Sequence, residues 1–371
     1  MRETRGLRLA LAPLLGLLLV GGASGIFTSA TVSPPSPGGF ADGAFCTYGK
    51  GYFSNSVEAA QRIQGGLPFS IGASPNTYSW TNLAALQQAV GTGGSPGAFS
   101  ASATNATDMG TGGNLAAQTL ALSLNLNFSE RVVTPTGFQP LSLVNMDRVK
   151  LGGLQLTLAQ ASALNGQAAV QVREAANIAL GGGALPYGLS FVQLTDLIGL
   201  LNSSFSETYK DANGVVQPCG HSSKFAERHI YQPYITSNAF AGKRPASIAL
   251  FAPKPPYNTF SGEVVHVGRG CPGVDTYLAD PMGKIALVER GLCRFDNKVA
   301  KAQQAGATGV IVYNSPAGGE AITAMGGDNP VAQGDPSVIG TTITIPATFV
   351  QRSTGVLLQE GTAPVTAFVQ Q

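Results

Sequence analysis

Two short and almost unbroken apolar runs stand close together in the last third of the chain, at Ile285–Val288 and Val310–Tyr313. An extended segment keeps such a run only when both of its faces are covered, which is typical of a strand in the middle of a sheet. We therefore expect two buried strands here.

The segment between these runs has the period of an amphipathic helix. One side of it carries Phe295, Val299, Ala302 and Gly306 at 3.6-residue spacing, and the other carries Asn297, Lys301 and Gln304. Asp296 is a candidate N-cap, and Gly306 is a typical helix stop. Strand, helix and strand together predict a βαβ unit with parallel strands and a right-handed crossover.

Upstream, between residues 40 and 220, helical periodicity alternates with glycine-rich turns. The predicted helices are Val57–Gln64, Leu83–Val90, Leu115–Asn125, Val170–Leu180 and Phe191–Asn202. Ser190 is the expected N-cap of the last helix, whose apolar stripe is typical of a core-facing side. Gly152 and Gly153 predict a hairpin turn between residues 149–151 and 154–156.

These patterns predict an α+β protein of two domains, for which 371 residues are sufficient. Residues 40–220 are expected to form a mostly helical domain with a small β ribbon. The junction falls around residues 220–237. Residues 237–371 are expected to form an α/β domain built around the central βαβ unit.

The first 25 residues have the pattern of a signal peptide, with Arg2, Arg5 and Arg8 ahead of an apolar run, Leu9–Val20, and then small residues. A retained membrane anchor is the alternative, but the run is about 12 residues long and a span needs about 20. Residues 26–39, rich in Pro, Ser and Gly, predict a linker. We expect a secreted, extracellular protein without stable membrane insertion.

Charge narrows the range of partners. The chain has 22 Lys and Arg against 20 Asp and Glu, and the leader supplies the excess, so the mature chain is neutral. A protein that binds nucleic acid gains affinity by releasing counterions from phosphates, which requires a basic surface. We therefore expect no nucleic acid partner.

The chain has four cysteines, and an exported chain with an even number favours disulfides over free thiols. The economical pairing joins Cys46 to Cys219 and Cys271 to Cys293, although the sequence alone leaves three pairings open. A metal site made of His266, Cys271 and Cys293 is an alternative. It lacks a fourth ligand and the close cysteine pair that zinc sites usually show.

A series of spaced motifs covers about the last third of the chain. Residues 283–291 read GKIALVERG and residues 309–314 read GVIVYN, with Cys293-Arg294-Phe295, Lys298-Val299, Ala305-Gly306-Ala307, Met325–Asp328 and Ile345-Pro346-Ala347 in order around them. The series resembles the protease-associated (PA) domain. The resemblance implies a non-catalytic α/β module of secreted proteins, found in or attached to subtilisin-like proteases, metallo-aminopeptidases or sorting receptors.

The N-terminal region resembles a repeat-type domain of secreted bacterial proteins. The matching residues are Cys46-Thr47, Gly51-Tyr52-Phe53, the turn at Gly152-Gly153 and residues 175–183. Phe53 and Ser54-Asn55-Ser56 stand where that family usually has Trp and Lys-Asn-His. The resemblance implies export and no particular chemistry.

No recognised catalytic motif is present. The three histidines, His221, His229 and His266, have no metal-binding spacing, and there is no Gly-x-Ser-x-Gly elbow. His221 precedes Ser222 and Ser223, but a base rarely reaches the hydroxyl of its own neighbour, and no motif places an Asp to orient the ring. We therefore predict that the protein is not an enzyme and uses neither metal nor cofactor.

The predicted function is contact with a protein or peptide partner, a protease among them, through the PA-like domain. Tyr257, in the proline-rich stretch 252–259, and Met325 and Asp328, in a glycine-rich stretch, are the hypothesised binding residues, because binding is usually carried by such loops. The alternative is a secreted hydrolase or peptidase whose unrecognised catalytic residues lie in the N-terminal domain.

Overall fold

The computed structural model describes residues 40–130, 138, 141–253, 259–362 and 364–370. The predicted signal peptide, 1–25, and linker, 26–39, lie outside the described residues. Within the described ranges, no helix is long and apolar enough to cross a membrane.

Helices dominate the N-terminal half, where the structure confirms all five that the sequence predicts. They are α2 (Val57–Gln64), α3 (Leu83–Gly91), α4 (Gly113–Glu130), α6 (Ala169–Leu180) and α7 (Phe191–Asn202), and the sequence missed α1 (Lys50–Asn55), α5 (Leu158–Leu164) and α8 (Lys224–His229). Three 3-10 turns are η1 (Gly110–Gly112), η2 (Met146–Arg148) and η3 (Pro186–Gly188).

Short strands complete this half. The predicted hairpin is present as β5 (Lys150–Leu151) and β6 (Leu154–Gln155), turning at Gly152 and Gly153, both of which have positive φ. A three-stranded sheet of β1 (Phe69–Ala73), β2 (Asn76–Trp80) and β3 (Ala103–Thr104) was not expected. Two further pairs join β4 (Ser142–Leu143) to β9 (Ile230–Tyr231) and β7 (Glu207–Lys210) to β8 (Val216–His221).

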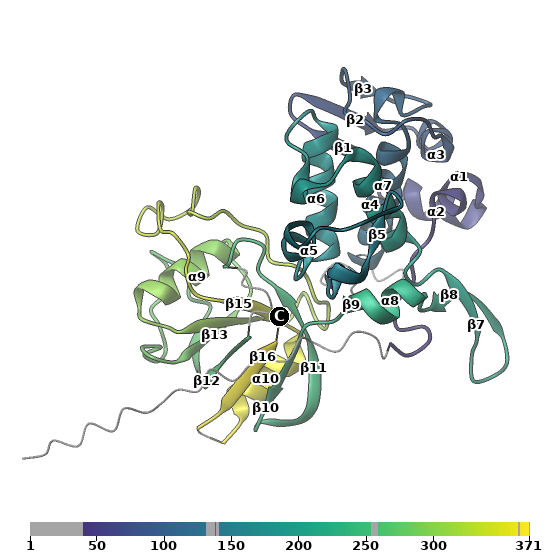
Figure 1. The fold of residues 1–371 in the computed structure, drawn as a ribbon. Coiled ribbons are helices and arrows are strands. Elements are labelled where there is room, and N and C mark those ends of the chain that lie inside the picture. The colour runs from purple at the N-terminus through teal and green to yellow at the C-terminus, as the bar shows by residue number, and fades with distance from the viewer. Residues whose placement is uncertain (1–39, 131–137, 139–140, 254–258, 363, 371) are drawn as a thin grey trace, which may run out of the picture. The chain divides into compact units, whose positions relative to one another are not determined.

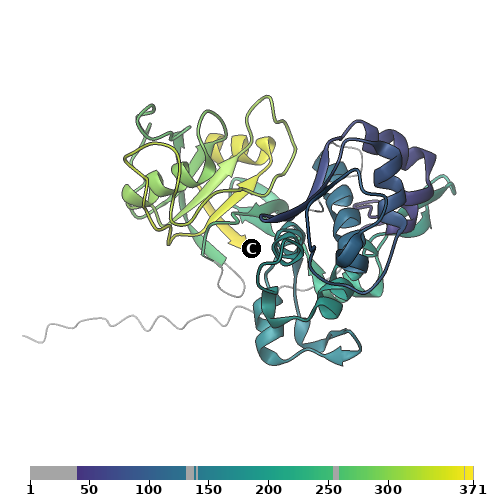
Figure 2. The ribbon, with the colours of Figure 1, turned by 90° about the horizontal axis from the view of Figure 1, so that it is seen from above.

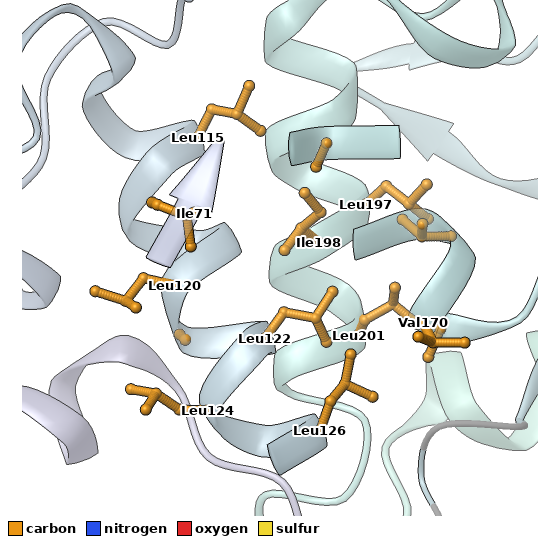
Figure 3. Close-up of a cluster of buried hydrophobic side chains, with 14 of the residues drawn as sticks. Ile71, Leu115, Leu120, Leu122, Leu124, Leu126, Val170, Leu197, Ile198 and Leu201 are labelled. Carbon is orange, nitrogen blue, oxygen red and sulfur yellow. The ribbon is translucent and has the colours of Figure 1, made fainter. Parts of the chain in front are cut away.

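The core of this half lies around α4 and α7. Leu122 of α4 and Ile198 and Leu201 of α7 are essentially inaccessible to solvent, and Figure 3 shows them among the side chains between the two helices. The predicted N-cap of α7 is confirmed: the Ser190 hydroxyl accepts from the amide of Gln193, and the Gln193 side chain accepts from the amide of Ser190. This reciprocal capping box satisfies two amides that the helix start leaves without helical partners.

Seven strands of the C-terminal part close into a barrel in the order β10-β11-β15-β14-β13-β12-β16 (Figure 1). Their bounds are β10 (Tyr234–Ser237), β11 (Phe240–Ile248), β12 (Thr259–Gly268), β13 (Ile285–Glu289), β14 (Gly309–Tyr313), β15 (Ala347–Val350) and β16 (Thr366–Gln370). The helices are α9 (Phe295–Gln304) and α10 (Arg352–Glu360).

The predicted βαβ unit is confirmed as β13, α9 and β14, with β13 and β14 paired in parallel. Alternate residues of the two strands belong to different apolar clusters. Ile285, Leu287 and Ile311 pack with Leu358 of α10 and Val369 of β16, whereas Ala286, Val288, Val310 and Val312 pack with Val299 of α9. Figures 1 and 2 show α9 beside these strands. Both faces are covered, which explains the unbroken apolar runs.

Two details of α9 differ from expectation. The N-cap is Arg294, without a side-chain cap, and Asp296 lies inside the first turn. Asn297, expected on the solvent side, is 1% exposed, and its neighbours Asp296 and Lys298 are fully buried. The helix is therefore covered on more than its apolar side, because loops fold over its start.

Two disulfides join the cysteines in the economical pairing. Cys46 bonds to Cys219, with Cα atoms 5.4 Å apart, and Cys271 bonds to Cys293, with Cα atoms 5.7 Å apart. These bonds occupy the cysteines of the alternative metal site at His266. Within the described ranges, no three His, Cys, Asp or Glu residues converge in a way that could hold a metal ion.

The protein thus has a mixed α/β fold with a seven-stranded barrel in its C-terminal part. The division into separate domains at 40–220 and 237–371 stays a prediction.

Candidate functional site

Of the three hypothesised binding residues of the C-terminal part, the structure describes Met325 and Asp328. Tyr257 lies outside the described residues. Met325 is fully buried, and its backbone pairs with β11 and the residues after it, accepting from the amide of Leu250 and donating to Ile248. Its side chain therefore belongs to the core and cannot reach a partner. Asp328 forms an ion pair with Arg294, 2.6 Å between Oδ2 and Nη2, and its role in binding stays untested.

Polar groups that could act chemically gather instead in the segment from Cys219 to His229. The segment carries two of the three histidines, one at the end of β8 and one at the end of α8. Ser223 caps α8, its hydroxyl accepting from the amide of Ala226.

His221 is oriented by a carboxylate. Its Nδ1 donates to Oδ1 of Asp42 over 2.7 Å, although the two residues are 179 positions apart in the chain. Both side chains are about half exposed, 45% for His221 and 48% for Asp42. The bond fixes the ring and its tautomer, which leaves Nε2 turned to its surroundings as the group that can take or give a proton.

The disulfide Cys46–Cys219 brings these two residues together. Asp42 lies four residues before one cysteine and His221 two residues after the other. The amide of Gly43 also donates to the carbonyl of Gly220 over 3.1 Å. Tyr209 packs so closely on both glycines that a Cβ at either would collide with its ring, so the crossing of the two chain segments requires glycine. The Asp–His pair is thus held by a covalent bond, a backbone hydrogen bond and a close contact.

The pKa of His221 is raised above its ordinary value of 6.5. The hydrogen bond to Asp42 is the largest cause, followed by the charge of Asp42 and smaller contributions from Glu207 and Glu227. A histidine paired with a carboxylate holds its proton more tightly, so this ring changes protonation at a higher pH than a free histidine.

A pocket of about 330 Å³ lies at the other end of α8. Asn145, Arg148, Glu227, Arg228 and His229 line it. His229 donates from Nδ1 to the carbonyl of Val144 over 3.2 Å, and burial lowers its pKa below 6.5, so the ring is neutral near pH 7. Two guanidinium groups make the pocket suitable for a carboxylate.

Glu227 is common to the surroundings of His221 and the pocket. It lines the pocket and also lies close enough to His221 to raise the pKa of that ring. His229 and two arginines therefore share the pocket with the Glu227 carboxylate, and His221 stands just before the short helix that carries three of these residues. The pocket can bind an anionic group, and the oriented His221 can transfer a proton.

The sequence singled out His221 but found no Asp for it. The signal that could have found Asp42 is the disulfide pairing: if Cys46 and Cys219 are bonded, residues just outside the two cysteines lie close together. No sequence motif marks Arg148, Arg228 and His229, because they meet only through the tertiary structure.

Comparison with known proteins identifies the C-terminal part. Residues 260–358 match the family described as the PA domain, and the seven-stranded barrel fits it. Leucine aminopeptidase 2 of Trichophyton rubrum is 47% identical over 75 residues, which is 20% of this chain and 15% of that protein. The C5a peptidase of Streptococcus pyogenes serotype M1 is 36% identical over 81 residues, 22% of this chain and 6% of that protein.

Among solved structures, the aminopeptidase from Aneurinibacillus sp. strain AM-1 matches with a TM-score of 0.27 and 23% identity, covering 38% of this chain and 30% of that one. The chain thus spans only a small part of the relatives it matches, 15% of the length of the leucine aminopeptidase.

These relatives correct the prediction of a non-catalytic protein. The proteins that share sequence with this chain are named aminopeptidases and a C5a peptidase, which are hydrolases. The prediction that the protein is not an enzyme is therefore wrong by this comparison, and the peptidase alternative fits better. The prediction rested on the absence of a recognised catalytic motif, and residues that meet only through the tertiary structure leave no such motif in the sequence.

Proposed function

We propose that this protein, which carries a PA domain at residues 260–358, is an extracellular peptide hydrolase whose general base is His221. The observation that carries the proposal is the 2.7 Å hydrogen bond between His221 and Asp42. The peptidases among the relatives support the reaction class. The protein or peptide partner that the sequence predicts is then the peptide substrate.

In this proposal His221 accepts a proton at Nε2 from a water molecule that attacks the peptide carbonyl. Asp42 holds the ring by Nδ1 and stabilises the imidazolium that forms. The proton can then pass from Nε2 to the leaving amine. The raised pKa of His221 favours the first transfer, because a ring that binds its proton more tightly is a stronger base.

Arg148 and Arg228 are proposed to bind a carboxylate of the substrate in the adjoining pocket. A bidentate contact from a guanidinium orients a carboxylate as well as attracting it. This would favour peptides that place an acidic side chain or a C-terminal carboxylate near the bond to be cut.

The proposal includes secretion and two domains. The two disulfides are typical of an oxidising compartment, which agrees with removal of residues 1–25 as a signal peptide. A helical domain at 40–220, together with residues 221–229 that follow it, would carry the catalytic groups, and a PA domain within 237–371 would accompany it.

The test is hydrolysis of a fluorogenic peptide library by the mature chain, followed over pH. We expect turnover to fall about a hundredfold or more in His221→Ala, which is the scale of general acid–base catalysis. Lys224→Ala, an exposed change on α8, is the matched control and should keep wild-type activity. Turnover in His221→Ala equal to wild type would overturn the proposal, as would a wild-type chain that cuts no peptide.

Asp42→Asn sharpens the test. Asp42 raises the pKa of His221, so its removal lowers that pKa. The base is active when neutral, and the rising limb of the pH–rate profile should therefore move to lower pH in Asp42→Asn, with a lower maximum. A lower maximum without movement of the limb would mean that Asp42 supports the fold and does not tune the base.

A further inference from the structure

The two ends of the disulfide between Cys271 and Cys293 differ in their access to solvent. Cys271 is 1% exposed, whereas Cys293 is half-buried in the short loop that leads into α9. Its neighbour Leu292 is 72% exposed. Cys293 is therefore the end of this bond that a reagent in solution can approach.

The inner sulfur lies beside a buried cation. Nζ of Lys298 is 3.4 Å from Sγ of Cys271 and donates to the carbonyl of Arg269 over 2.5 Å. Lys298 is fully buried, which lowers its pKa to about 8, so its ammonium is still charged at pH 7. A charged ammonium at this distance stabilises a thiolate at Cys271 when the disulfide opens.

Other charged groups surround the same cysteine. Lys301 donates from Nζ to the carbonyl of Cys271 over 3.2 Å. Asp275 accepts from the amide of Cys271 over 3.0 Å and forms an ion pair with Arg269, 3.2 Å between Oδ1 and Nη2. Among the described side chains with these contacts, Arg269, Lys298 and Lys301 are cationic and Asp275 is anionic. Such an electropositive environment is typical of cysteines that react as thiolates.

The loop at the outer end of the bond is strained. Gly291 and Leu292 have φ values of 134° and 61°, and a leucine rarely adopts the left-handed region. The amide of Cys293 donates to the carbonyl of Gly291 over 2.8 Å, which tightens the turn. Because the disulfide fixes the next residue of this loop, opening the bond allows the backbone to relax.

We propose that the bond between Cys271 and Cys293 is a site of thiol–disulfide exchange with a small thiol, in which Cys293 is attacked and Cys271 leaves as a thiolate beside Lys298. The thiolate of the small molecule bonds to Sγ of Cys293, the bond between the two cysteine sulfurs breaks, and its electron pair stays on Sγ of Cys271. The product is a mixed disulfide on Cys293.

A second thiolate completes the exchange. It attacks the small-molecule sulfur of the mixed disulfide and releases Cys293 as a thiolate. The protein disulfide thereby gains two electrons, and two small thiols, which have released their protons to solvent, are oxidised to their own disulfide. The inference is independent of the proposed hydrolysis.

The test is incubation of the full mature chain with glutathione at pH 7, followed by rapid alkylation and mass spectrometry of the cysteine peptides. The bond between Cys46 and Cys219 is the internal comparison, because the polar group beside it is neutral: the hydroxyl of Tyr48, 3.3 Å from Sγ of Cys219. We expect the bond between Cys271 and Cys293 to open at least about tenfold faster, because a thiolate with a lowered pKa leaves faster. Glutathione should be found on Cys293 and the alkyl group on Cys271.

Lys298→Met removes the ammonium and keeps an unbranched buried side chain. Opening of the bond between Cys271 and Cys293 should become about tenfold slower in this variant, and opening of the bond between Cys46 and Cys219 should not change. A mere loss of stability would act in the opposite direction, because a loosened fold exposes disulfides and speeds their reduction. The direction of the change therefore separates stabilisation of the thiolate from a structural role of Lys298.

Three results would overturn the inference. The first is a bond between Cys271 and Cys293 that stays closed, or that opens no faster than the bond between Cys46 and Cys219. The second is glutathione on Cys271 in place of Cys293. The third is a folded Lys298→Met variant in which opening is unchanged or faster. If thermal unfolding shows that Lys298→Met does not fold, the first two measurements, which need only the wild type, decide the question.

Discussion

Helices α7 and α9 have similar amphipathic patterns in the sequence but are buried in different ways. In α7 the stripe containing Leu197, Ile198 and Leu201 packs against other helices, and this burial is mainly apolar. In α9 three consecutive polar residues, Asp296, Asn297 and Lys298, are at most 1% exposed, next to the apolar side that covers the sheet. The same periodicity therefore leads to two kinds of environment.

The polar residues of α9 are buried because they hold loops. Asp296 accepts from the Arg294 guanidinium and from the amide of Asp328, and Asn297 donates to the carbonyl of Gln333. Lys298 donates from Nζ to the carbonyl of Arg269. A loop without helix or strand must satisfy its backbone groups in another way, and side chains from a neighbouring helix can do so. Helix α7 packs mainly on other helices, and its Asp196 accepts from the amide of Gly152 in the hairpin turn.

The first way to sharpen this comparison is to make a cavity in the apolar core. Leu122→Ala removes a fully buried side chain between α4 and α7, and we expect a loss of about 3–4 kcal/mol in the free energy of unfolding. Urea titration followed by circular dichroism measures it. Ile178→Ala on α6, where the side chain is 51% exposed, is the control and should change stability by less than about 1 kcal/mol. Equal effects would show that the contact between α4 and α7 is not tightly packed.

The second way is to remove the central carboxylate of α9. Asp296→Ala leaves the amide of Asp328 and the side chain of Asn297 without their acceptor, and we expect a loss of about 2–3 kcal/mol in the free energy of unfolding. Hydrogen exchange should also become faster near residue 328, because the loop loses its anchor.

Asp280→Ala, in an exposed turn where the carboxylate accepts from the amide of Met282, is the matched control. A loss in Asp296→Ala no larger than in this control would mean that the buried network adds nothing to stability. Unchanged hydrogen exchange near residue 328 would contradict the view that α9 holds the loop.

The contrast between the two helices also explains what the sequence could predict. The hydrophobic period of an element depends only on that element and on which of its sides is buried. The bounds of α2 and α7, the cap at Ser190 and the βαβ unit could therefore be predicted from the sequence. The burial of Asn297 did not follow, because its partners Gln333 and Asp335 come from a loop more than 30 residues later. A helical pattern cannot show that a loop covers the polar side.

The candidate site was less predictable than the fold for the same reason. His221 meets Asp42 across 179 positions, and only the disulfide between Cys46 and Cys219 indicates that they lie close together. Met325 shows a different error, in which a buried residue was predicted to be exposed. The glycines after it suggested an exposed loop, but its backbone forms an isolated bridge with Ala249 and its side chain enters the core.

The third prediction uses pH to test the burial of the charged residue Lys298 in α9. Burial lowers the pKa of Lys298 from 10.5 to about 8. Between these values the unfolded chain binds more protons than the folded one, so this lysine makes stability rise with pH over that window and contributes nothing to the slope below it. We expect the wild type to gain about 2 kcal/mol relative to Lys298→Met between pH 8 and pH 10.5, measured by urea titration at each pH.

A flat difference for Lys298→Met over this window would show that the ammonium keeps an ordinary pKa in the folded protein, and hence that its contacts with the loop fully replace water.

The smallest expected effect concerns how the two helices begin. Helix α7 starts with the capping box of Ser190 and Gln193, whereas α9 starts at Arg294 without a side-chain cap. Ser190→Ala should lower the free energy of unfolding by about 1 kcal/mol, because the amide of Gln193 loses its acceptor. Ser203→Ala, at the other end of α7, is the control and should change it by less than about 0.5 kcal/mol. If the two serines had equal effects, the start of α7 would be fixed by its apolar packing alone, and the difference between the helices would lie entirely in what covers them.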